Sequence, residues 1–270
     1  MKRLIRSTLL ASACAAVCAL TAMPPTASAA SPANSQTLAF GVDPTFPPFE
    51  SKTPDGSFVG FDIDLGNAIC AQLNVHCKWV EQGFDGMIPA LKARKFDAIL
   101  SAMTATPARR AQIDFTDKLY GGSARLIAPA GSKLQPSVDS LRGHRIGVQQ
   151  GAVQESYARA EWAPNGVTIV SYQSPDQIYE DLSTGRLDAS FQASVQADLG
   201  FLRTPRGKSF AFAGAEVKDP RATGDGIAIG ARKGDEQLIA KINQAIDAIR
   251  KSGTYDKLAH RYFSFDIYGD

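Results

Sequence analysis

The sequence predicts an α/β protein built from two lobes of similar design. Segments with the apolar pattern of strands alternate with segments that carry apolar residues on one helical face, an order typical of sheets covered by helices. The pattern begins again near the middle of the chain. Two segments repeat one arrangement, in which a helix end, a basic residue, an apolar residue and Asp-Ala precede a strand: ALKARKFDAIL at 90–100 and EDLSTGRLDAS at 180–190.

In the first half, the expected strands and helices follow one another closely. The spacing of apolar residues predicts strands at 38–42, 76–80 and 96–103, and helices at 62–73 and 86–93. The last of these strands is a nearly continuous apolar run, as in a strand that is buried on both faces. The prolines of PTFPPF, which follows the first strand, exclude a helix there.

The second half repeats this order and ends in two helices. Strands are expected at 145–149, 168–172 and 187–191. Helices are expected at 151–160, from Pro175 (with Ser174 as N-cap) to Gly185, from 238 to Gly253, and at 254–262.

The composition is that of an ordinary globular chain. Hydrophobic residues make up 44% and charged residues 21% of the 270, which is enough apolar material for a sizeable core. The net charge is only +2, without a block of like charges, so nothing indicates a nucleic-acid or membrane-surface partner. The sequence lacks the motifs of serine hydrolases, nucleotide-binding loops and zinc proteases, and its histidines are scattered. No catalytic residue, metal site or cofactor is therefore expected.

Residues 1–29 have the pattern of a secretory signal peptide. Lys2 and Arg3 precede an apolar run at 9–20, and Ala27-Ser28-Ala29 forms a cleavage site. The apolar run is shorter than the ~20 residues that a membrane-spanning helix needs. We therefore expect export to the periplasm.

Cysteine usage is interpreted in the light of this export. Cys14 and Cys18 fall within the expected signal peptide, and neither follows a Leu at the spacing of a lipoprotein site. Cys70 and Cys77 remain after cleavage, and an oxidising compartment permits a disulfide between them. Two buried free thiols are the alternative.

Arg109 stands out among the candidate ligand-binding residues. Thr106 suits an N-cap and Pro107 the first helical position, which places Arg109 in the first turn of a helix, where the dipole disfavours a cation. A nearby anion is therefore expected. It is either a ligand carboxylate, which a guanidinium can clamp through two hydrogen bonds, or a protein carboxylate such as Asp114 or Asp117. A solvated surface Arg is the third alternative.

Three other features near strand ends are candidate ligand contacts. The segment QQGAVQ at 149–154 leads from a strand into a helix N-terminus, whose free N–H groups can hold a carboxylate or form an ordinary turn. Phe46 and Phe84, in loops after strands, can flank an aliphatic or guanidinium chain or anchor their loops in the core. Asp43, at the end of the first strand, can accept a hydrogen bond from a ligand cation or form an Asx-turn.

Together these motifs resemble the family 3 extracellular solute-binding proteins. The similarity spans about 36–270 and is strongest with the subgroup that binds lysine, arginine and ornithine, or histidine. The segments that carry it occur in the same order as in the family: GVDPTFPPFE, FVGFDIDLGNAICAQL, FDGMIPALKARKFDAIL, IGVQQGAVQESY, GTYDKLAHRYF and FDIYGD.

The resemblance implies the type II periplasmic-binding-protein fold, with a ligand site between two lobes. Lobe 1 is expected at 36–120 plus 225–270 and lobe 2 at 125–218, with hinge crossings at 121–124 and 218–225. Closure of the lobes around a ligand would signal an inner-membrane ABC permease. A monomer is the default expectation, because the cleft must open and dock.

The resemblance also assigns ligand contacts by position. Arg109 would clamp the ligand α-carboxylate with help from the Val153 backbone N–H, and Asp43 would meet the distal cationic group. The remaining contacts would flank or line the ligand: Phe46, Phe84, Ser101, Thr104, Gln149 and Gln154. The family's short disulfide corresponds to Cys70 and Cys77.

The chain departs from the subgroup at positions that line the expected site. Ala193 stands where the subgroup has the Asp that accepts the ligand α-ammonium, Ala102 replaces a Ser, and Ala152-Val153 replaces a Ser-Thr pair. Loss of a charged partner for a buried ammonium costs about 10²-fold in affinity. Either Ser194, Ser190 or a water compensates, or the ligand lacks a free α-ammonium, as in opine-type N-substituted amino acids and guanidino acids.

The expected function is that of a periplasmic substrate-binding protein of an ABC importer for a cationic amino acid (arginine, lysine, ornithine or histidine) or a derivative. An enzyme similar to cyclohexadienyl dehydratase is the alternative from another class. It would need a general acid or base in the cleft, and no Glu falls at an obvious cleft position in the sequence. A membrane-receptor sensor module is disfavoured because no second apolar span follows.

Overall fold

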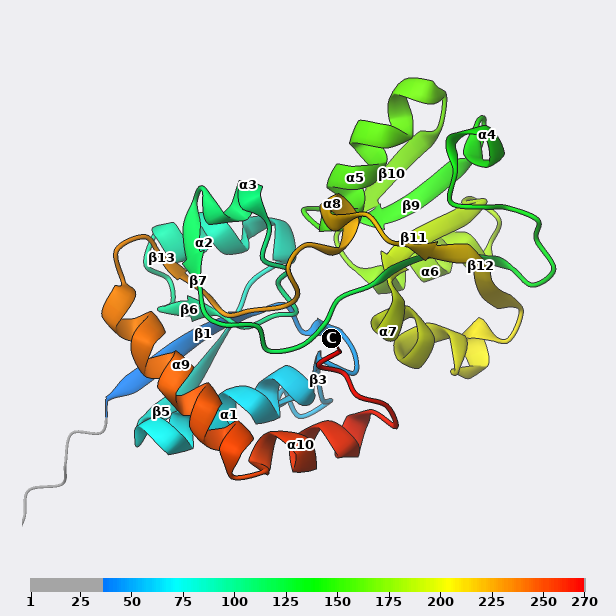
Figure 1. Ribbon diagram of the computed structural model, residues 1–270. Helices are drawn as coiled ribbons and strands as arrows, with labels where there is room; N and C mark the ends of the chain where they lie inside the picture. The colour runs from blue at the N-terminus through cyan, green and yellow to red at the C-terminus, as the bar shows by residue number, and fades with distance from the viewer. Residues whose placement is uncertain (1–35, 270) are drawn as a thin grey trace, which may run out of the picture. The chain divides into compact units, whose positions relative to one another are not determined.

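The computed structural model describes residues 36–269. The expected signal peptide at 1–29 and its two cysteines therefore lie outside the described residues. Within them, the predicted α/β architecture is confirmed: there are two five-stranded mixed sheets, each with its own helices, and a small three-stranded antiparallel sheet (Figure 1). We call the two large sheets, with their covering helices, the first and second sheet domains.

The first sheet has the strand order β5-β1-β6-β13-β7. Strand β1 pairs in parallel with β5 and β6, and β13 pairs antiparallel with β6 and β7. Its strands are β1 (Thr37–Val42), β5 (His76–Glu81), β6 (Ala98–Ile99), β7 (Ile113–Phe115) and β13 (Gly230–Arg232). Its helices are α1 (Phe61–Leu73), α2 (Met87–Lys92), α3 (Pro107–Arg110), α9 (Glu236–Lys251) and α10 (Thr254–Tyr262), with the 3-10 turn η1 (Phe84–Gly86) before α2.

The second sheet has the order β10-β9-β11-β8-β12. Strand β9 pairs in parallel with β10 and β11, and β8 pairs antiparallel with β11 and β12. Its strands are β8 (Ala124–Pro129), β9 (Arg145–Gln149), β10 (Thr168–Tyr172), β11 (Ala189–Ala193) and β12 (Phe210–Val217). Its helices are α4 (Val138–Leu141), α5 (Val153–Glu161), α6 (Pro175–Ser183), α7 (Ser194–Ala197) and α8 (Pro220–Thr223). Short turns η2 (Ala163–Asn165), η3 (Asp198–Leu202) and η4 (Pro205–Gly207) connect them.

The chain passes between the two sheets twice. It leaves the first sheet after β7 and returns after β12 to supply β13 (Figure 1). The two passages are hydrogen-bonded to each other, since the Leu119 N–H donates to the Ile227 carbonyl and the Ile227 N–H to the Tyr120 carbonyl. The C-terminal segment packs on the first passage, where the Gly121 N–H donates to the Ile267 carbonyl. Residues that are distant in sequence therefore meet beside the pocket described below.

Buried apolar side chains cover both faces of each sheet. In the first sheet domain, α1, α9 and α10 enclose one cluster, in which the rings of Phe49, Phe61, Tyr120 and Phe263 contact one another. A second cluster lies under α2 on the opposite face. The second sheet domain has the same two-sided arrangement, with a core under α5 and another under α6. Each sheet domain therefore has three layers, with helices packed on both faces of its sheet, as the repeated sequence pattern predicts.

The small sheet was not predicted. Its strands are β2 (Thr45–Phe46), β3 (Glu50–Lys52) and β4 (Phe58–Val59), which lie between β1 and α1 in the chain. The prolines of PTFPPF exclude a helix there, as expected, but they still permit two very short strands, one within this segment and one directly after it. This sheet brings Phe46 and Glu50 next to the end of β1.

Several element boundaries differ from the predicted ones. The apolar run 96–103 is a strand only at Ala98–Ile99, because the chain then bends away from the sheet into the pocket turn. The strand expected at 187–191 lies two residues later, at Ala189–Ala193. Ser174 is the N-cap residue of α6 by position, but its side chain makes no capping hydrogen bond. Periodicity finds these elements, whereas tertiary contacts decide where they end.

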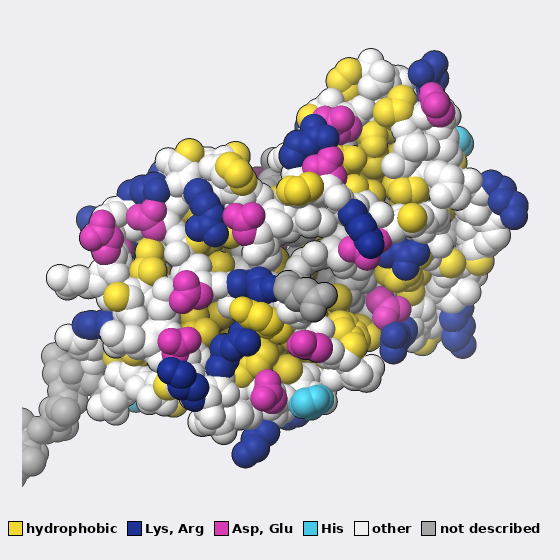
Figure 2. Space-filling model, viewed as in Figure 1, with side chains coloured by type: hydrophobic (Ala, Val, Ile, Leu, Met, Phe, Trp, Pro, Cys, Tyr) yellow, Lys and Arg dark blue, Asp and Glu magenta, His cyan; other side chains and the backbone are white. Residues whose placement is uncertain are grey.

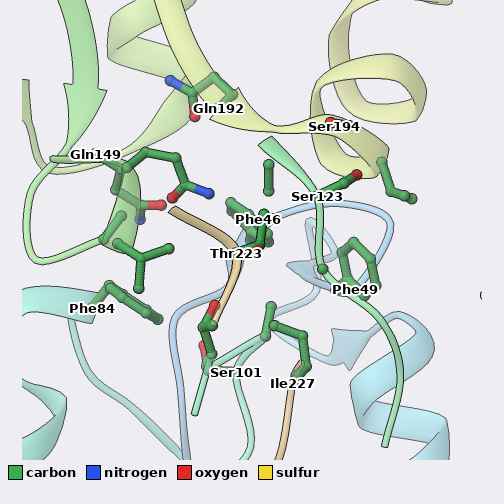
Figure 3. Close-up of a pocket in the computed structure, with 18 of the residues that line it drawn as sticks. Phe46, Phe49, Phe84, Ser101, Ser123, Gln149, Gln192, Ser194, Thr223 and Ile227 are labelled. Atoms are coloured by element: carbon green, nitrogen blue, oxygen red, sulfur yellow. The ribbon is translucent and has the colours of Figure 1, made fainter. Parts of the chain in front are cut away.

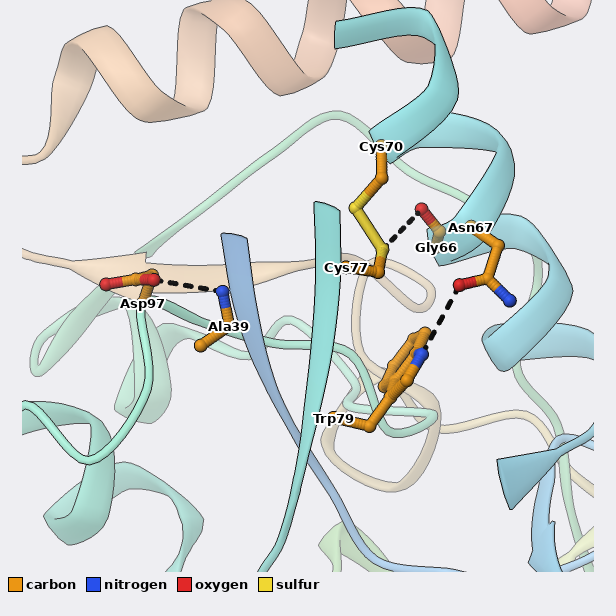
Figure 4. Close-up of a disulfide and its surroundings, with 7 residues drawn as sticks. All are labelled: Ala39, Gly66, Asn67, Cys70, Cys77, Trp79 and Asp97. Carbon is orange, nitrogen blue, oxygen red and sulfur yellow. Dashed lines mark hydrogen bonds between the residues drawn. A yellow bond between two sulfur atoms is a disulfide. The ribbon is translucent and has the colours of Figure 1, made fainter. Parts of the chain in front are cut away.

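A disulfide joins Cys70, in the last turn of α1, to Cys77 in β5 (Figure 4). Asn74 ends α1 with a left-handed backbone (φ 55°), which turns the chain sharply enough for β5 to return beside the helix. Trp79, also in β5, donates a hydrogen bond to the Asn67 side chain of α1 at 3.3 Å. The expected pairing is thus confirmed, and it links the helix to the edge strand of the first sheet.

On the face of the molecule in Figure 2, Lys and Arg are interspersed with Asp and Glu, in keeping with a sequence that has no block of like charges. Among residues 36–269, no helix is both long and apolar enough to span a bilayer. The same residues contain no cluster of His, Cys, Asp and Glu that could hold a metal ion.

We expect the double substitution Cys70→Ser and Cys77→Ser to lower the free energy of unfolding by about 2–3 kcal/mol, because the bridge closes a short loop. Urea denaturation of ligand-free protein measures this difference. The matched control is the unsubstituted protein under reducing conditions, which should lose the same amount. Equal stability of the substituted and oxidised proteins would contradict the expectation.

Candidate functional site

One pocket takes its walls from both sheet domains (Figure 3). Figure 3 shows Phe84 and Ser101 of the first sheet domain on one side, and Gln149, Gln192 and Ser194 of the second on the other. All the residues that the sequence singled out as ligand-binding line this pocket: Asp43, Phe46, Phe84, Ser101, Ala102, Thr104, Arg109, Gln149, Ala152, Val153, Gln154 and Ala193.

Arg109 is buried in the pocket wall, and its hydrogen bonds go to backbone carbonyls. Its residue is only 9% exposed, and its guanidinium donates to the carbonyls of Thr104 (2.8 Å) and Gly151 (2.9 Å). Burial lowers the pKa of Arg109 to about 10, so the side chain is still a cation at neutral pH. Among the described residues, no Asp or Glu ion-pairs with it; Asp114 pairs with Lys233 instead. The site therefore holds an uncompensated positive charge, a costly arrangement unless an anion joins it.

The helix dipole at Arg109 is weaker than the sequence suggested. Thr106 does cap α3, since its Oγ1 accepts a hydrogen bond from the Arg109 N–H, and Pro107 is the first helical residue. However, α3 is only four residues long, too short for a substantial dipole. Burial, rather than the position in a helix, makes the Arg109 charge need a partner.

Asp43 supplies a negative charge to the same pocket from the end of β1. One of its carboxylate oxygens accepts from Thr45 Oγ1 at 2.8 Å, and the other from the Phe84 N–H at 3.1 Å and from Gln149 Nε2 at 3.3 Å. Burial raises its pKa, while the bonds from Thr45 and Phe84 oppose this shift. Asp43 can therefore form a turn and also contact a ligand cation, because the turn holds its carboxylate at the pocket.

Phe46 and Phe84 likewise both anchor their segments in the core and line the pocket. Phe84 opens η1 and lies 5.3 Å, from ring centroid to guanidinium carbon, from Arg109, a cation–π contact that helps to hold this side chain. Phe46 belongs to β2 rather than to a loop, and packs against Phe49 with a centroid separation of 6.0 Å. Both rings are anchored in their domain while they line the pocket.

The turn after β6 presents backbone and hydroxyl groups to the pocket. Ser101 Oγ accepts from the Asp43 N–H at 3.0 Å and donates to Glu50 Oε1 at 2.8 Å. Ala102 has a positive φ of 45°, which is unusual for a residue other than glycine, and its N–H donates to Asp62 Oδ2 at 2.7 Å. A buried carboxylate therefore holds the pocket turn in a strained backbone conformation.

The second sheet domain contributes the turn between β9 and α5. Ala152 is the N-cap residue of α5 and provides no side-chain cap, so N–H groups of the first turn are left for another acceptor. Gly151 has a φ of 77°, and a Cβ there would lie 2.8 Å from the Asp85 Cα of the first sheet domain. Glycine is thus required at this position by both the backbone conformation and the close approach.

The wall around Ala193 is polar but uncharged. Ala193 ends β11 with a methyl group, and its neighbours Gln192 and Ser194 also line the pocket. The Gln192 Nε2, Ser194 Oγ and Ser190 Oγ atoms are buried and have no hydrogen-bond partner among the described residues. Gln192 and Ser194 flank Ala193, the position at which the resemblance places the ligand amino group, whereas Ser190 is fully buried in β11 and does not line the pocket. Gln192 and Ser194 can bind a neutral polar group, and the Ser194 hydroxyl can also accept from an amine.

One expectation about the pocket was wrong. Glu50 lines it and is 1% exposed, whereas the sequence had suggested no Glu in the cleft. Glu50 follows the proline-rich segment and enters the pocket wall through β3, an element too short for periodicity to find. Tyr120, Ser123 and Thr223 were also missed, because they come from the two passages between the sheets. For Glu50, the only signal in the sequence was its place at the end of an apolar, proline-rich segment.

Comparison with known proteins gives the family. Residues 38–265 match the bacterial extracellular solute-binding proteins, family 3. The lysine/arginine/ornithine-binding periplasmic protein of Escherichia coli K12 is 51% identical over 235 residues, which cover 87% of this chain and 90% of that protein. The histidine-binding periplasmic protein of the same strain is 49% identical over 243 residues, with coverage of 90% and 94%.

A solved structure supports the same fold. A Salmonella typhimurium periplasmic binding protein of high arginine specificity superposes with a TM-score of 0.78 at 30% identity, covering 85% of this chain and 100% of that one. The fold class predicted from the sequence, a type II periplasmic-binding-protein fold, is therefore confirmed. With this fold, a pocket shared by two sheet domains and a family match over most of the described residues, the chain belongs to the bacterial extracellular solute-binding proteins of family 3.

Proposed function

We propose that this protein is the periplasmic substrate-binding component of an ABC importer and that it binds a cationic amino acid or a close derivative. The observation that carries the proposal is the buried Arg109 guanidinium, which within residues 36–269 has carbonyl partners but no carboxylate partner, in the same pocket as the Asp43 carboxylate. A ligand with a carboxylate at one end and a cation at the other satisfies both charges. The names of the relatives support arginine, lysine, ornithine and histidine as candidates.

Within this proposal, each of the site residues predicted from the sequence has a role that its contacts allow. Arg109 and the Val153 N–H receive the ligand carboxylate, and Asp43 receives the distal cation. The remaining side chains flank or line the ligand: Phe46, Phe84, Ser101, Ala102, Thr104, Gln149, Ala152, Gln154 and Ala193. The two sheet domains are already hydrogen-bonded across the pocket, since Arg109 donates to Gly151 and Gln149 donates to Asp43. A bound ligand would add further hydrogen bonds to both domains.

The same proposal assigns lobes and a hinge. Lobe 1 comprises 36–120 plus 225–270 and lobe 2 comprises 125–218, with crossings at 121–124 and 218–225. The chain changes sheet in these two segments, and residues from both of them line the pocket. A rotation there would open the pocket without changing either core. Closure around the ligand would then present a surface for the inner-membrane permease.

Export to the periplasm after removal of residues 1–29, and action as a monomer without nucleic acid, complete the proposal. The charge pattern of the signal segment and the periplasmic relatives support export. The relatives named above are binding proteins, which favours binding without chemistry over the dehydratase alternative.

A second candidate ligand class rests on Ala193. Among the described residues, the wall around Ala193 contains no carboxylate and presents the unsatisfied Gln192 amide and Ser194 hydroxyl. An amide N–H calls for an acceptor. A ligand that lacks a free α-ammonium, such as an opine-type N-substituted amino acid or a guanidino acid, therefore fits this wall as well as a free amino acid does.

Removal of the Arg109 charge should abolish tight binding of every carboxylate ligand. We expect Arg109→Met to weaken arginine binding by about 10²-fold or more, because the carboxylate loses its charge-assisted hydrogen bonds. Isothermal titration calorimetry measures this change. Arg109→Lys is the matched control, which keeps the charge but not the fork and should recover only part of the affinity. Unchanged affinity in Arg109→Met would contradict the assignment.

The isosteric change Asp43→Asn should affect only ligands with a cationic end. We expect it to weaken arginine binding by about tenfold or more and to leave citrulline, the uncharged isostere of arginine, nearly unaffected. Competition titrations with both ligands separate the two effects. Equal losses for arginine and citrulline would mean that Asp43 acts only through the turn.

Restoring a carboxylate at position 193 separates the two ligand classes. If the ligand is a free amino acid, Ala193→Asp should tighten its binding by about tenfold or more, because an ammonium gains a buried counter-charge. If the ligand lacks an α-ammonium, the same change should weaken binding. Ala193→Asn, which adds similar volume without charge, is the control. Identical behaviour of the two variants would show that the α-substituent does not lie at this wall.

A further inference from the structure

Glu50 is a buried carboxyl group of the pocket that takes no part in the ligand contacts proposed above. It begins β3, is 1% exposed and lines the pocket. Its Oε1 accepts a hydrogen bond from Ser101 Oγ at 2.8 Å. Its Oε2 is buried and has no donor among the described residues. An ionised Glu50 would therefore leave one oxygen unsatisfied in a desolvated site, which is strongly unfavourable.

Asp62 of α1 is a second carboxyl group behind this wall, and it is fully buried. Its Oδ1 accepts from the Tyr120 hydroxyl at 2.7 Å and its Oδ2 from the Ala102 N–H at 2.7 Å. These two donors require an acceptor, which favours the ionised form of Asp62. Among the described residues, no Lys, Arg or His forms an ion pair with Glu50 or Asp62, so their charges are not neutralised by a neighbour.

Glu50 and Asp62 lie close together, since the Asp62 N–H donates to the carbonyl of Phe49, the residue before Glu50, at 2.9 Å. Two neighbouring buried carboxyl groups without a cation cannot both be ionised at low cost. Burial and the charge of Asp62 raise the pKa of Glu50 well above its usual range. Burial raises the pKa of Asp62 to about 6, against the opposing hydrogen bonds from Ala102, Tyr120 and Glu50. A proton on Glu50 donated to Asp62 would satisfy both groups, and would explain why Glu50 Oε2 has no donor among the described residues.

The other ionisable groups around Glu50 come from different elements. Asp43, at the end of β1, raises the pKa of Glu50 through its charge and shares Ser101 with it, since the Asp43 N–H also donates to Ser101 Oγ. Tyr120 lies in the first passage between the sheets and is held un-ionised by burial. Arg109 is the cation in the same pocket, but its guanidinium donates to the carbonyl groups of Thr104 and Gly151. A ligand cation near Asp43 and Ser101 would be the positive charge that Glu50 lacks.

We propose that Glu50 is a ligand-binding carboxyl that exchanges a proton for the cationic group of the ligand. In the empty pocket Glu50 holds a proton that it donates to Asp62. When a ligand ammonium, guanidinium or imidazolium lies beside Asp43 and Ser101, the O–H bond of Glu50 breaks and the proton leaves to solvent. The new carboxylate then accepts a hydrogen bond from the ligand N–H. This inference rests on the proposed cationic ligand, and it makes affinity rise with pH while Glu50 is protonated in the empty protein.

Carboxyl ¹³C NMR of protein labelled at glutamate tests the protonation state directly. The Glu50 resonance is assigned by its absence in Glu50→Gln. We expect a protonated Glu50 in the empty protein at about pH 6, where exposed glutamates are ionised. Addition of arginine should convert it to the ionised form, and addition of citrulline should not. An ionised Glu50 in the empty protein, or a Glu50 that stays protonated with arginine, would overturn the proposal.

Calorimetry in buffers of different ionisation enthalpy counts the protons released on binding. We expect release of up to about one proton with arginine, and none with arginine in Glu50→Gln, whose amide can still donate to Asp62 and preserve the fold. Continued release in that variant would mean that the proton comes from Asp43 or elsewhere, and the proposal fails. If arginine binds the unsubstituted protein without proton release, the ligand assignment stands and only this proposal falls. If no cationic ligand binds, the ligand assignment falls and the proposed proton exchange at Glu50 falls with it.

Discussion

The buried guanidinium of Arg109 is the interaction on which the site depends. It lies between the two sheet domains, with one hydrogen bond to Thr104 of its own domain and one to Gly151 of the other. Neutral carbonyls orient the guanidinium but do not compensate its charge, so the desolvation penalty is left for an anion to offset. The pocket is thus prepared for a carboxylate, and the same bond to Gly151 requires the two domains to approach closely.

The rest of the fold positions charges around that cation. Strand β1 ends at Asp43, and the turn after β6 is held by Asp62 in a strained conformation at Ala102. The two passages between the sheets place Tyr120 beside this turn and let the second sheet domain face it with Gln149 and α5. The Arg109 cation, the carboxyl groups of Asp43 and Glu50 and a neutral polar wall therefore meet in one pocket. Their order along the pocket determines which ligands fit.

The sequence predicts the alternating architecture well, because long periodic segments such as 61–73 and 236–251 have one apolar face and clear ends. The site residues found by position all line one pocket, which follows from the whole-chain resemblance rather than from local pattern. Glu50 could not be found, because the two- and three-residue strands of the small sheet have no period to detect, and its neighbour Asp62 comes from another element. The weight given to the dipole at Arg109 was wrong because α3 is so short.

The most direct test of the proposed function is binding of arginine, lysine, ornithine and histidine to ligand-stripped protein, measured by calorimetry and by the shift in melting temperature. The paired charges of Arg109 and Asp43 predict a saturable site for at least one of these ligands or an N-substituted derivative, such as octopine, with a stabilisation of about 2.7 kcal/mol at 100 times its Kd. Stabilisation by uncharged amino acids or by prephenate alone, with none from any ligand that has a cationic end, would contradict it.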